Sequence, residues 1–268
     1  MRYSILTLAI IALIILSGCD SRLIMPDYTP PIVPKGVFAE AGDNYAEVFW
    51  QANTDRDIAG YRIYVRTESM SRFQYLATTT SNYFVDDGIL NGVTYYYGVT
   101  AYDFNGNESD LSYDLGVATP RPEGYDVVLK NYRTYPGLSG YDFSTNSIGR
   151  YDDHYTDLFF EYYDGVCYLV VWDDTEIQDM GYTNSLYDIV KSPSMGWSPT
   201  GDEVAILGHT YVIKTWDNHY AKIRIVGISA ASVRFDWAYQ LQTSNPYLKI
   251  NSDQSRFTLT QNRSVRVK

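Results

Sequence analysis

The chain has 268 residues, a formal net charge of −11 at pH 7 and only two cysteines, and it contains 27 tyrosines and five tryptophans. The acidic surplus excludes sequence-independent nucleic-acid binding, which depends on basic surface, and also a polybasic hold on anionic lipid. The length suffices for two domains of ordinary size. The aromatic content fits β-structure, where rings pack well on a pleated surface, and it fits an aromatic binding face equally well.

The N-terminus carries a targeting signal. After Met1-Arg2, residues 5–16 are almost all apolar, a run of about 12 residues where a bilayer-spanning helix needs roughly 20. Leu16-Ser17-Gly18-Cys19 follows, and it resembles the lipobox of bacterial lipoproteins. The resemblance implies that residues 1–18 are a cleaved signal peptide and that a lipidated Cys19 anchors the protein to the membrane. A plain secretory signal with an incidental cysteine is the alternative.

The predicted location is therefore the bacterial cell envelope, at the inner or outer membrane and facing the periplasm or the exterior. Residues 19–35 contain four prolines and no helical or strand period. They are expected to form an extended, semi-rigid tether. At ~3.3 Å per residue its reach is at most about 50 Å, enough to hold a domain clear of the lipid surface.

Residues 36–120 alternate between short strands and turns, with the turn dipeptide Asn91-Gly92 between two of them. The segment resembles a fibronectin type III domain through Trp50, Asp57–Tyr61, Gly92–Tyr95 and Asp103–Ser109. The resemblance implies a seven-stranded β-sandwich that serves as a spacer or contact module, with Tyr95 in the family's tyrosine corner. Inward-facing residues are expected on three strands, namely Ala46, Val48 and Trp50, then Tyr61, Ile63 and Val65, then Tyr95, Tyr97, Val99 and Ala101.

Residues 121–124 are predicted to be a short linker, and residues 125–268 a second, mostly antiparallel β-rich domain, which makes the fold class all-β. The expected strands are Tyr125–Lys130, Leu158–Tyr163, Val166–Val171, Thr210–Thr215, Tyr220–Ile225 and Val233–Tyr239. The last three strands are predicted to form a meander, in which each strand pairs antiparallel with the next. Residues 177–190 are ambiguous, with one helical turn expected at Ser185–Val190.

No catalytic motif is present: the sequence has no nucleophile elbow, phosphate loop, dinucleotide fingerprint or zinc-protease helix. A non-enzyme is therefore expected. The acidic clusters Asp152-Asp153 and Asp173-Asp174-Glu176 are interpreted as solvated loop charges, with acid–base carboxylates or calcium ligands as the alternative. Because lipidation would consume Cys19, Cys167 is left without an intramolecular partner, as a small thiol in a strand that reads as buried on both faces.

The hairpin 208–225 resembles a segment of the HmuY-like lipoproteins through Gly208–Thr215 and His219–Ile225. The resemblance implies haem capture by a pair of histidines or methionines. A two-residue turn at Asp217-Asn218 places His209 and His219 over 20 Å apart at about 3.3 Å per residue, so these two do not share one iron. A haem-binding pair made of His154 and either His209 or His219 remains possible.

The pair Met180 and Met195 stays open as well. The hairpin tip is the best candidate contact surface, and the candidate ligand-binding residues are Trp216, His219, Tyr220 and His154. The expected function is a non-catalytic, membrane-anchored envelope lipoprotein that binds or displays a ligand, with haem as the candidate. The alternative is a structural or adhesive surface protein that binds polysaccharide or another envelope protein.

Overall fold

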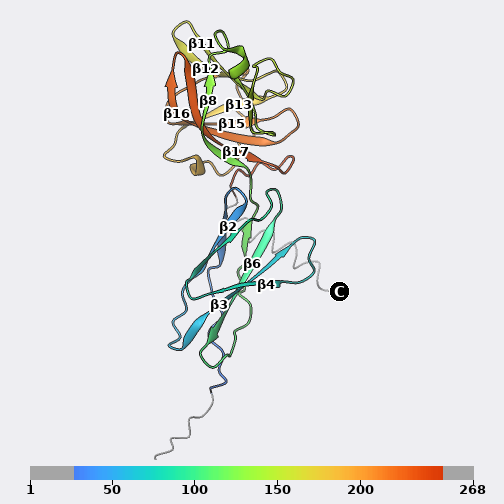
Figure 1. The fold of residues 1–268 in the computed structure, drawn as a ribbon, viewed down its shortest axis with the longest axis vertical. Coiled ribbons are helices and arrows are strands. Elements are labelled where there is room, and N and C mark those ends of the chain that lie inside the picture. Colours follow the sequence, from blue (N-terminus) through green and yellow to red (C-terminus); the bar gives the residue numbers. More distant parts are fainter. Residues whose placement is uncertain (1–26, 250–268) are drawn as a thin grey trace, which may run out of the picture.

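The computed structural model describes residues 27–249, which form two β-sandwiches stacked end to end (Figure 1). The described part contains 17 strands and two short 3-10 helices, so the predicted all-β class is confirmed. Residues 27–249 include no helix with the length and apolar character needed to cross a membrane. The lipobox and Cys19 lie outside the described residues, as does most of the tether.

The first sandwich packs a three-stranded sheet against a four-stranded sheet. The smaller sheet has the order β1-β2-β5, with β1 Phe38–Ala41, β2 Tyr45–Phe49 and β5 Tyr83–Asp87. The larger has the order β4-β3-β6-β7, with β3 Ile58–Thr67, β4 Gln74–Thr79, β6 Tyr95–Asp103 and β7 Gly116–Ala118. All the residues expected to face inward belong to the core or pack against it, because alternate positions on each strand point between the sheets.

Tyr95 forms the tyrosine corner of this sandwich. Its hydroxyl accepts a hydrogen bond from the backbone N–H of Leu90 at 3.0 Å, five residues upstream. Gly92 lies between them at φ +80°, a conformation that favours glycine, so the turn expected at Asn91-Gly92 is confirmed. A side chain at Gly92 would also stand 3.3 Å from Leu241 of the second sandwich.

The second sandwich consists of two five-stranded sheets around one core. One sheet has the order β10-β9-β11-β12-β14, with β9 Gly140–Asp142, β10 Ser147–Gly149, β11 Leu158–Tyr163, β12 Val166–Val170 and β14 Asp202–Val204. The other has the order β13-β15-β16-β17-β8, with β8 Glu123–Lys130, β13 Glu176–Tyr182, β15 His209–Lys214, β16 Tyr220–Ser229 and β17 Ser232–Gln240. The helices are η1 Pro136–Leu138 and η2 Leu186–Asp188.

The meander of three consecutive strands is confirmed as β15-β16-β17. The helical turn expected after Ser185 is η2. Ser185 caps it, because its side chain accepts from the backbone of the helix while its own N–H donates to the Asp188 carboxylate. Residues 176–182 form a strand that the sequence left ambiguous. Strand β8 begins at Glu123, so the last two residues of the expected linker pair with β17.

The expectation that 166–171 is buried on both faces is wrong. In β12 only Leu169 is fully buried, because its sheet has the core on one side alone. Cys167 is half-buried at the core margin, where its Sγ lies 3.5 Å from the carbonyl oxygen of Ser229. Burial still raises the pKa of this thiol, which disfavours the reactive thiolate.

Candidate functional site

The β15–β16 turn differs from its sequence prediction. Thr215 N–H donates to the His219 carbonyl at 3.0 Å, and Asn218 adopts φ +63°. The turn thus has three residues and Thr215 faces His219; a two-residue turn in which Trp216 faces His219 is wrong. The Thr215 hydroxyl explains the difference, because it donates to Asp217 at 2.6 Å and accepts from His219 N–H at 3.1 Å.

The His219 ring lies between two polar side chains. Nδ1 lies 3.1 Å from Asp217 Oδ1, and Nε2 lies 3.1 Å from the Thr243 hydroxyl. Burial opposes ionisation of Asp217, but hydrogen bonds from Thr215 and His219 outweigh it and hold the pKa of Asp217 below its usual value. Tyr220 is half-buried in β16, where it pairs with Lys214 and Gln240, so it belongs to the sheet rather than to the tip.

Trp216 and His154 come together although 62 residues separate them. Their ring centroids are 6.2 Å apart, and the His154 ring also lies 5.1 Å from the ring of Tyr155. Trp216 is 48% exposed and Tyr155 is 60% exposed. The structure thereby joins two of the four candidate residues into one exposed aromatic group on the second sandwich.

A hollow of about 250 Å³ opens beside this group. Tyr155 and Asp153, the two neighbours of His154, belong to its wall. The other lining residues are Asp142, Thr145, Ser147, Gly149 and Thr156. We call it the polar hollow, because most of its lining residues carry a hydroxyl or carboxylate group.

Asp157 connects the loops of the polar hollow to the core. Its side chain is buried and accepts a hydrogen bond from Phe143 N–H at 2.9 Å. Its pKa is raised to about 7, first by burial and then by the neighbouring carboxylates of Asp142 and Asp217, against the lowering effect of the hydrogen bond from Phe143 N–H. A carboxyl with this pKa gains or loses its proton near neutral pH. The hydrogen bond that ties the loops around the hollow to the core therefore involves a group whose charge changes in this range.

The other candidate haem ligands lie elsewhere. His209 opens β15 at the opposite end from the hairpin tip, where its Nδ1 is 2.9 Å from Asp179 Oδ2. Met180 is half-buried in β13, and Met195 is 77% exposed in a loop. None of these three residues lines the polar hollow, and neither do His154 and His219. The same holds for a smaller hollow where the two sandwiches meet.

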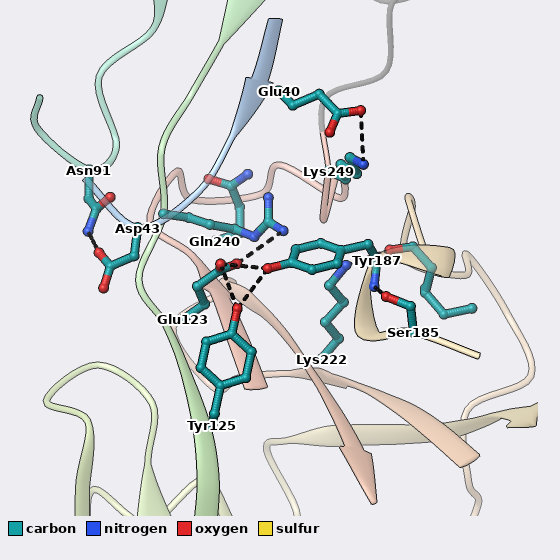
Figure 2. A network of polar contacts seen from close by, with 12 residues as sticks. Glu40, Asp43, Asn91, Glu123, Tyr125, Ser185, Tyr187, Lys222, Gln240 and Lys249 are labelled. Atoms are coloured by element: carbon teal, nitrogen blue, oxygen red, sulfur yellow. Dashed lines mark hydrogen bonds and ion pairs between the residues drawn. The ribbon is translucent and has the colours of Figure 1, made fainter. Parts of the chain in front are cut away.

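A second group of polar residues lies where the two sandwiches meet, and it was not predicted from the sequence (Figure 2). Glu123 is at its centre: Oε1 accepts from the hydroxyls of Tyr187 at 2.7 Å and Tyr125 at 3.2 Å. Its Oε2 lies 3.8 Å from Nη2 of Arg121. We call these four residues together with Lys222 the junction network.

Lys222 is fully buried, and its Nζ donates to the Ile189 carbonyl at 2.8 Å. The pKa of Lys222 is lowered to about 6, first by burial and then by the nearby positive charge of Arg121. Arg121 is also buried, and burial lowers its pKa. The two cations come from segments a hundred residues apart, which explains why no local sequence pattern marks them.

The junction network is enclosed by contacts between the sandwiches. Arg121 N–H donates to the Gly42 carbonyl at 3.2 Å, and Lys249 Nζ lies 3.4 Å from Glu40 Oε1 (Figure 2). The Gln242 amide reaches the Thr94 hydroxyl at 3.3 Å. A small hollow of about 160 Å³ remains, lined by Glu40, Ala41, Tyr45, Glu47, Tyr187 and Lys249. The sandwiches are thus joined by backbone, ion-pair and buried polar contacts together.

Comparison with known proteins covers about a third of the chain. No family model matches it. An amylopullulanase from Thermoanaerobacterium saccharolyticum is 31% identical over 100 residues, which are 37% of this chain and 8% of that protein. One from Thermoanaerobacterium thermosulfurigenes is 29% identical over 100 residues, 37% of this chain and 5% of that protein. The chain therefore matches only a small part of the length of these curated relatives.

Solved structures match over the same share. An Fn3-like protein from Clostridium thermocellum is 27% identical with a TM-score of 0.30, over 35% of this chain and 97% of that one. A β-1,2-glucanase from Parabacteroides distasonis is 28% identical with a TM-score of 0.31, over 37% of this chain and 14% of that one. With its three-on-four sheet order and tyrosine corner, the first sandwich is a fibronectin type III-like module, distantly related to such regions of the amylopullulanases.

Proposed function

We propose that the protein is a lipid-anchored display protein of a bacterial cell envelope, whose second sandwich binds carbohydrate at the polar hollow. The fibronectin type III-like module acts as the spacer that carries this sandwich away from the membrane. The observation that carries the proposal is the combination of hydroxyls, carboxylates and the exposed ring of Tyr155 around one hollow of about 250 Å³.

This lining suits a sugar chemically. A pyranose ring presents a patch of C–H groups that packs on an aromatic face, and its hydroxyls donate to carboxylates and exchange hydrogen bonds with Ser and Thr. Tyr155 offers the ring, Asp142 and Asp153 offer the acceptors, and the Trp216–His154 pair extends the aromatic surface beyond the hollow. A carbohydrate is also uncharged in its commonest form, which suits a chain with a net charge of −11.

The joint between the sandwiches supports a display role. A flexible joint would leave solvated polar groups between the domains, whereas Arg121, Glu123 and Lys222 are withdrawn from water here. Separating the sandwiches would expose the Arg121–Glu123 pair and break the contacts that enclose it. The spacer and the binding domain are thus expected to move as one body on the tether.

Carbohydrate is preferred to haem because none of the candidate haem ligands lines the polar hollow or the hollow at the junction. His209 and His219 are each already placed against an aspartate, Asp179 and Asp217. The polar hollow itself offers a carboxylate-rich wall, which suits hydroxyl groups better than a porphyrin face.

The test uses the chain without residues 1–18, carrying Cys19→Ser so that it stays unlipidated. Binding to a panel of envelope and storage polysaccharides is measured by affinity electrophoresis and then by calorimetry. Tyr155→Ala and Trp216→Ala should each weaken binding about tenfold, the equivalent of about 1.4 kcal/mol for a lost ring contact. Tyr113→Ala is the control, since Tyr113 is an exposed ring on the first sandwich.

Binding that is absent from the whole panel, or equal in Tyr155→Ala and Tyr113→Ala, would contradict the carbohydrate proposal. Haemin added to the same protein provides the second arm. A Soret shift that His154→Ala or His219→Ala abolishes would favour haem as the ligand instead.

A further inference from the structure

The outer face of the β1-β2-β5 sheet has an unusual composition for a solvent-facing surface. Phe38, Phe49 and Tyr83 are direct cross-strand neighbours, with ring centroids 5.1 and 6.4 Å apart. Tyr83 is 51% exposed, and Val85 beside it on β5 is 40% exposed. The rings form a row across the sheet, and we call it the aromatic row. It makes an apolar stripe on the outside of the first sandwich.

Two acidic residues, which we call the acidic row, lie next to the aromatic row on the side toward the junction. Glu40 pairs with Glu47 across β1 and β2, Val85 is opposite Glu47 on β5, and Asp87 lies two residues further along β5, opposite Tyr45. The three strands of this sheet contain no lysine or arginine. The face therefore offers an apolar stripe and a negative stripe side by side, and β5 is a sheet edge whose outer backbone groups have no strand partner within residues 27–249.

The last residue that the structure describes lies at this face. Lys249, its last residue, lies 3.4 Å from Glu40 and lines the junction hollow together with Tyr45 and Glu47. Residues 250–268 continue from that point. The β1 register places Glu40 only two residues from Phe38, so the aromatic row is about 7 Å beyond the acidic row at ~3.3 Å per residue.

The composition of residues 250–268 complements the face. The segment carries four basic side chains and one acidic one, and apolar residues alternate with polar ones around Phe257 and Leu259. Alternation of this kind is the pattern of a strand with one apolar side. The basic residues are Arg256, Arg263, Arg266 and Lys268.

We infer that residues 250–268 dock on the outer face of the β1-β2-β5 sheet, with Phe257 and Leu259 on the aromatic row and Arg256 beside Glu40 and Glu47. Seven residues separate Lys249 from Phe257, a reach of up to about 26 Å, so the segment spans the acidic row without strain. The docked segment covers the exposed rings and neutralises the acidic row.

Hydrogen exchange tests the placement in the full chain made without residues 1–18. Amides of Tyr83–Asp87 should exchange about tenfold faster in Phe257→Ser/Leu259→Ser than in the unaltered chain. Unchanged exchange there would refute docking.

Discussion

Arg121 and Glu123 lie side by side inside the domain junction, with Nη2 and Oε2 3.8 Å apart and side chains 2% and 4% exposed. At this separation the pair is an electrostatic contact rather than a hydrogen bond. Two nitrogens of Arg121 and the Oε2 of Glu123 make no hydrogen bond to the described residues. The stability of the junction therefore depends on the two charges cancelling.

Glu123→Gln should consequently destabilise the protein strongly. Glutamine keeps an acceptor for Tyr187 and Tyr125 but leaves the Arg121 charge without compensation, which costs about 3–5 kcal/mol for a broken buried pair. Urea unfolding measures the loss. Asp126→Asn is the control, because the Asp126–Arg234 pair is at least half exposed and contributes less than about 1 kcal/mol. Similar losses in the two variants would show that the junction charges are well solvated.

Lys222→Met should change how stability depends on pH. Lys222 has a pKa of about 6 in the folded chain, set first by burial, against about 10.4 when unfolded. Between these values the unfolded chain binds the extra proton, so the free energy of unfolding rises with pH by up to about 1.4 kcal/mol per unit. The methionine variant should lose this slope between pH 6 and 9. If the free energy of unfolding changed with pH in the same way in both proteins, Lys222 would not be neutral in the folded chain.

Asp157→Asn should change the pH dependence of stability in the opposite direction. The folded chain keeps the Asp157 proton up to a pH of about 7, while the unfolded chain releases it near pH 4. Unfolding therefore becomes easier as pH rises across this window, and asparagine abolishes the change while still accepting from Phe143 N–H. The variant should match the unaltered protein at pH 4 and exceed it at pH 8, by at most about 4 kcal/mol. Thermal melts across this range test the prediction.

Cys19→Ala should prevent lipidation. When cells producing the protein are fed an alkyne-tagged fatty acid, the unaltered chain should carry the label and sediment with membranes. The alanine variant should lose both properties, whereas Cys167→Ala should keep them because Cys167 lies in strand β12. Label that persists in Cys19→Ala would contradict the lipobox interpretation.

Much of the fold was predictable because its determinants are local. The alternation of Val233, Phe235, Trp237 and Tyr239 predicted both a strand and its buried side, and the stretch from Gly92 to Tyr95 predicted the tyrosine corner. Strand β13 was ambiguous because its sequence mixes acidic and apolar residues, and only Ile177 is fully buried. Its place in the sheet comes from pairing with β15, which no local pattern encodes.

The candidate site was predictable only in part. Trp216 and His154 were each proposed from their own surroundings, but their contact arises from packing between distant loops. The junction network was missed for the same reason, although Lys222 inside the apolar stretch of β16 was a sign of a buried cation. The turn was mispredicted because the Thr215 hydroxyl, rather than the Asp217-Asn218 dipeptide, determines where it closes.

The hairpin tip lies near the junction and not at the far end of the molecule. The segment after β17 binds it there, since Ser244 N–H donates to the Asn218 carbonyl at 2.7 Å, and β17 pairs with the first residues of β8. A ligand at this position approaches a tethered molecule from the side. Neighbouring copies on a crowded membrane would therefore obstruct one another, and we expect the bound fraction per molecule to fall as their lateral density rises.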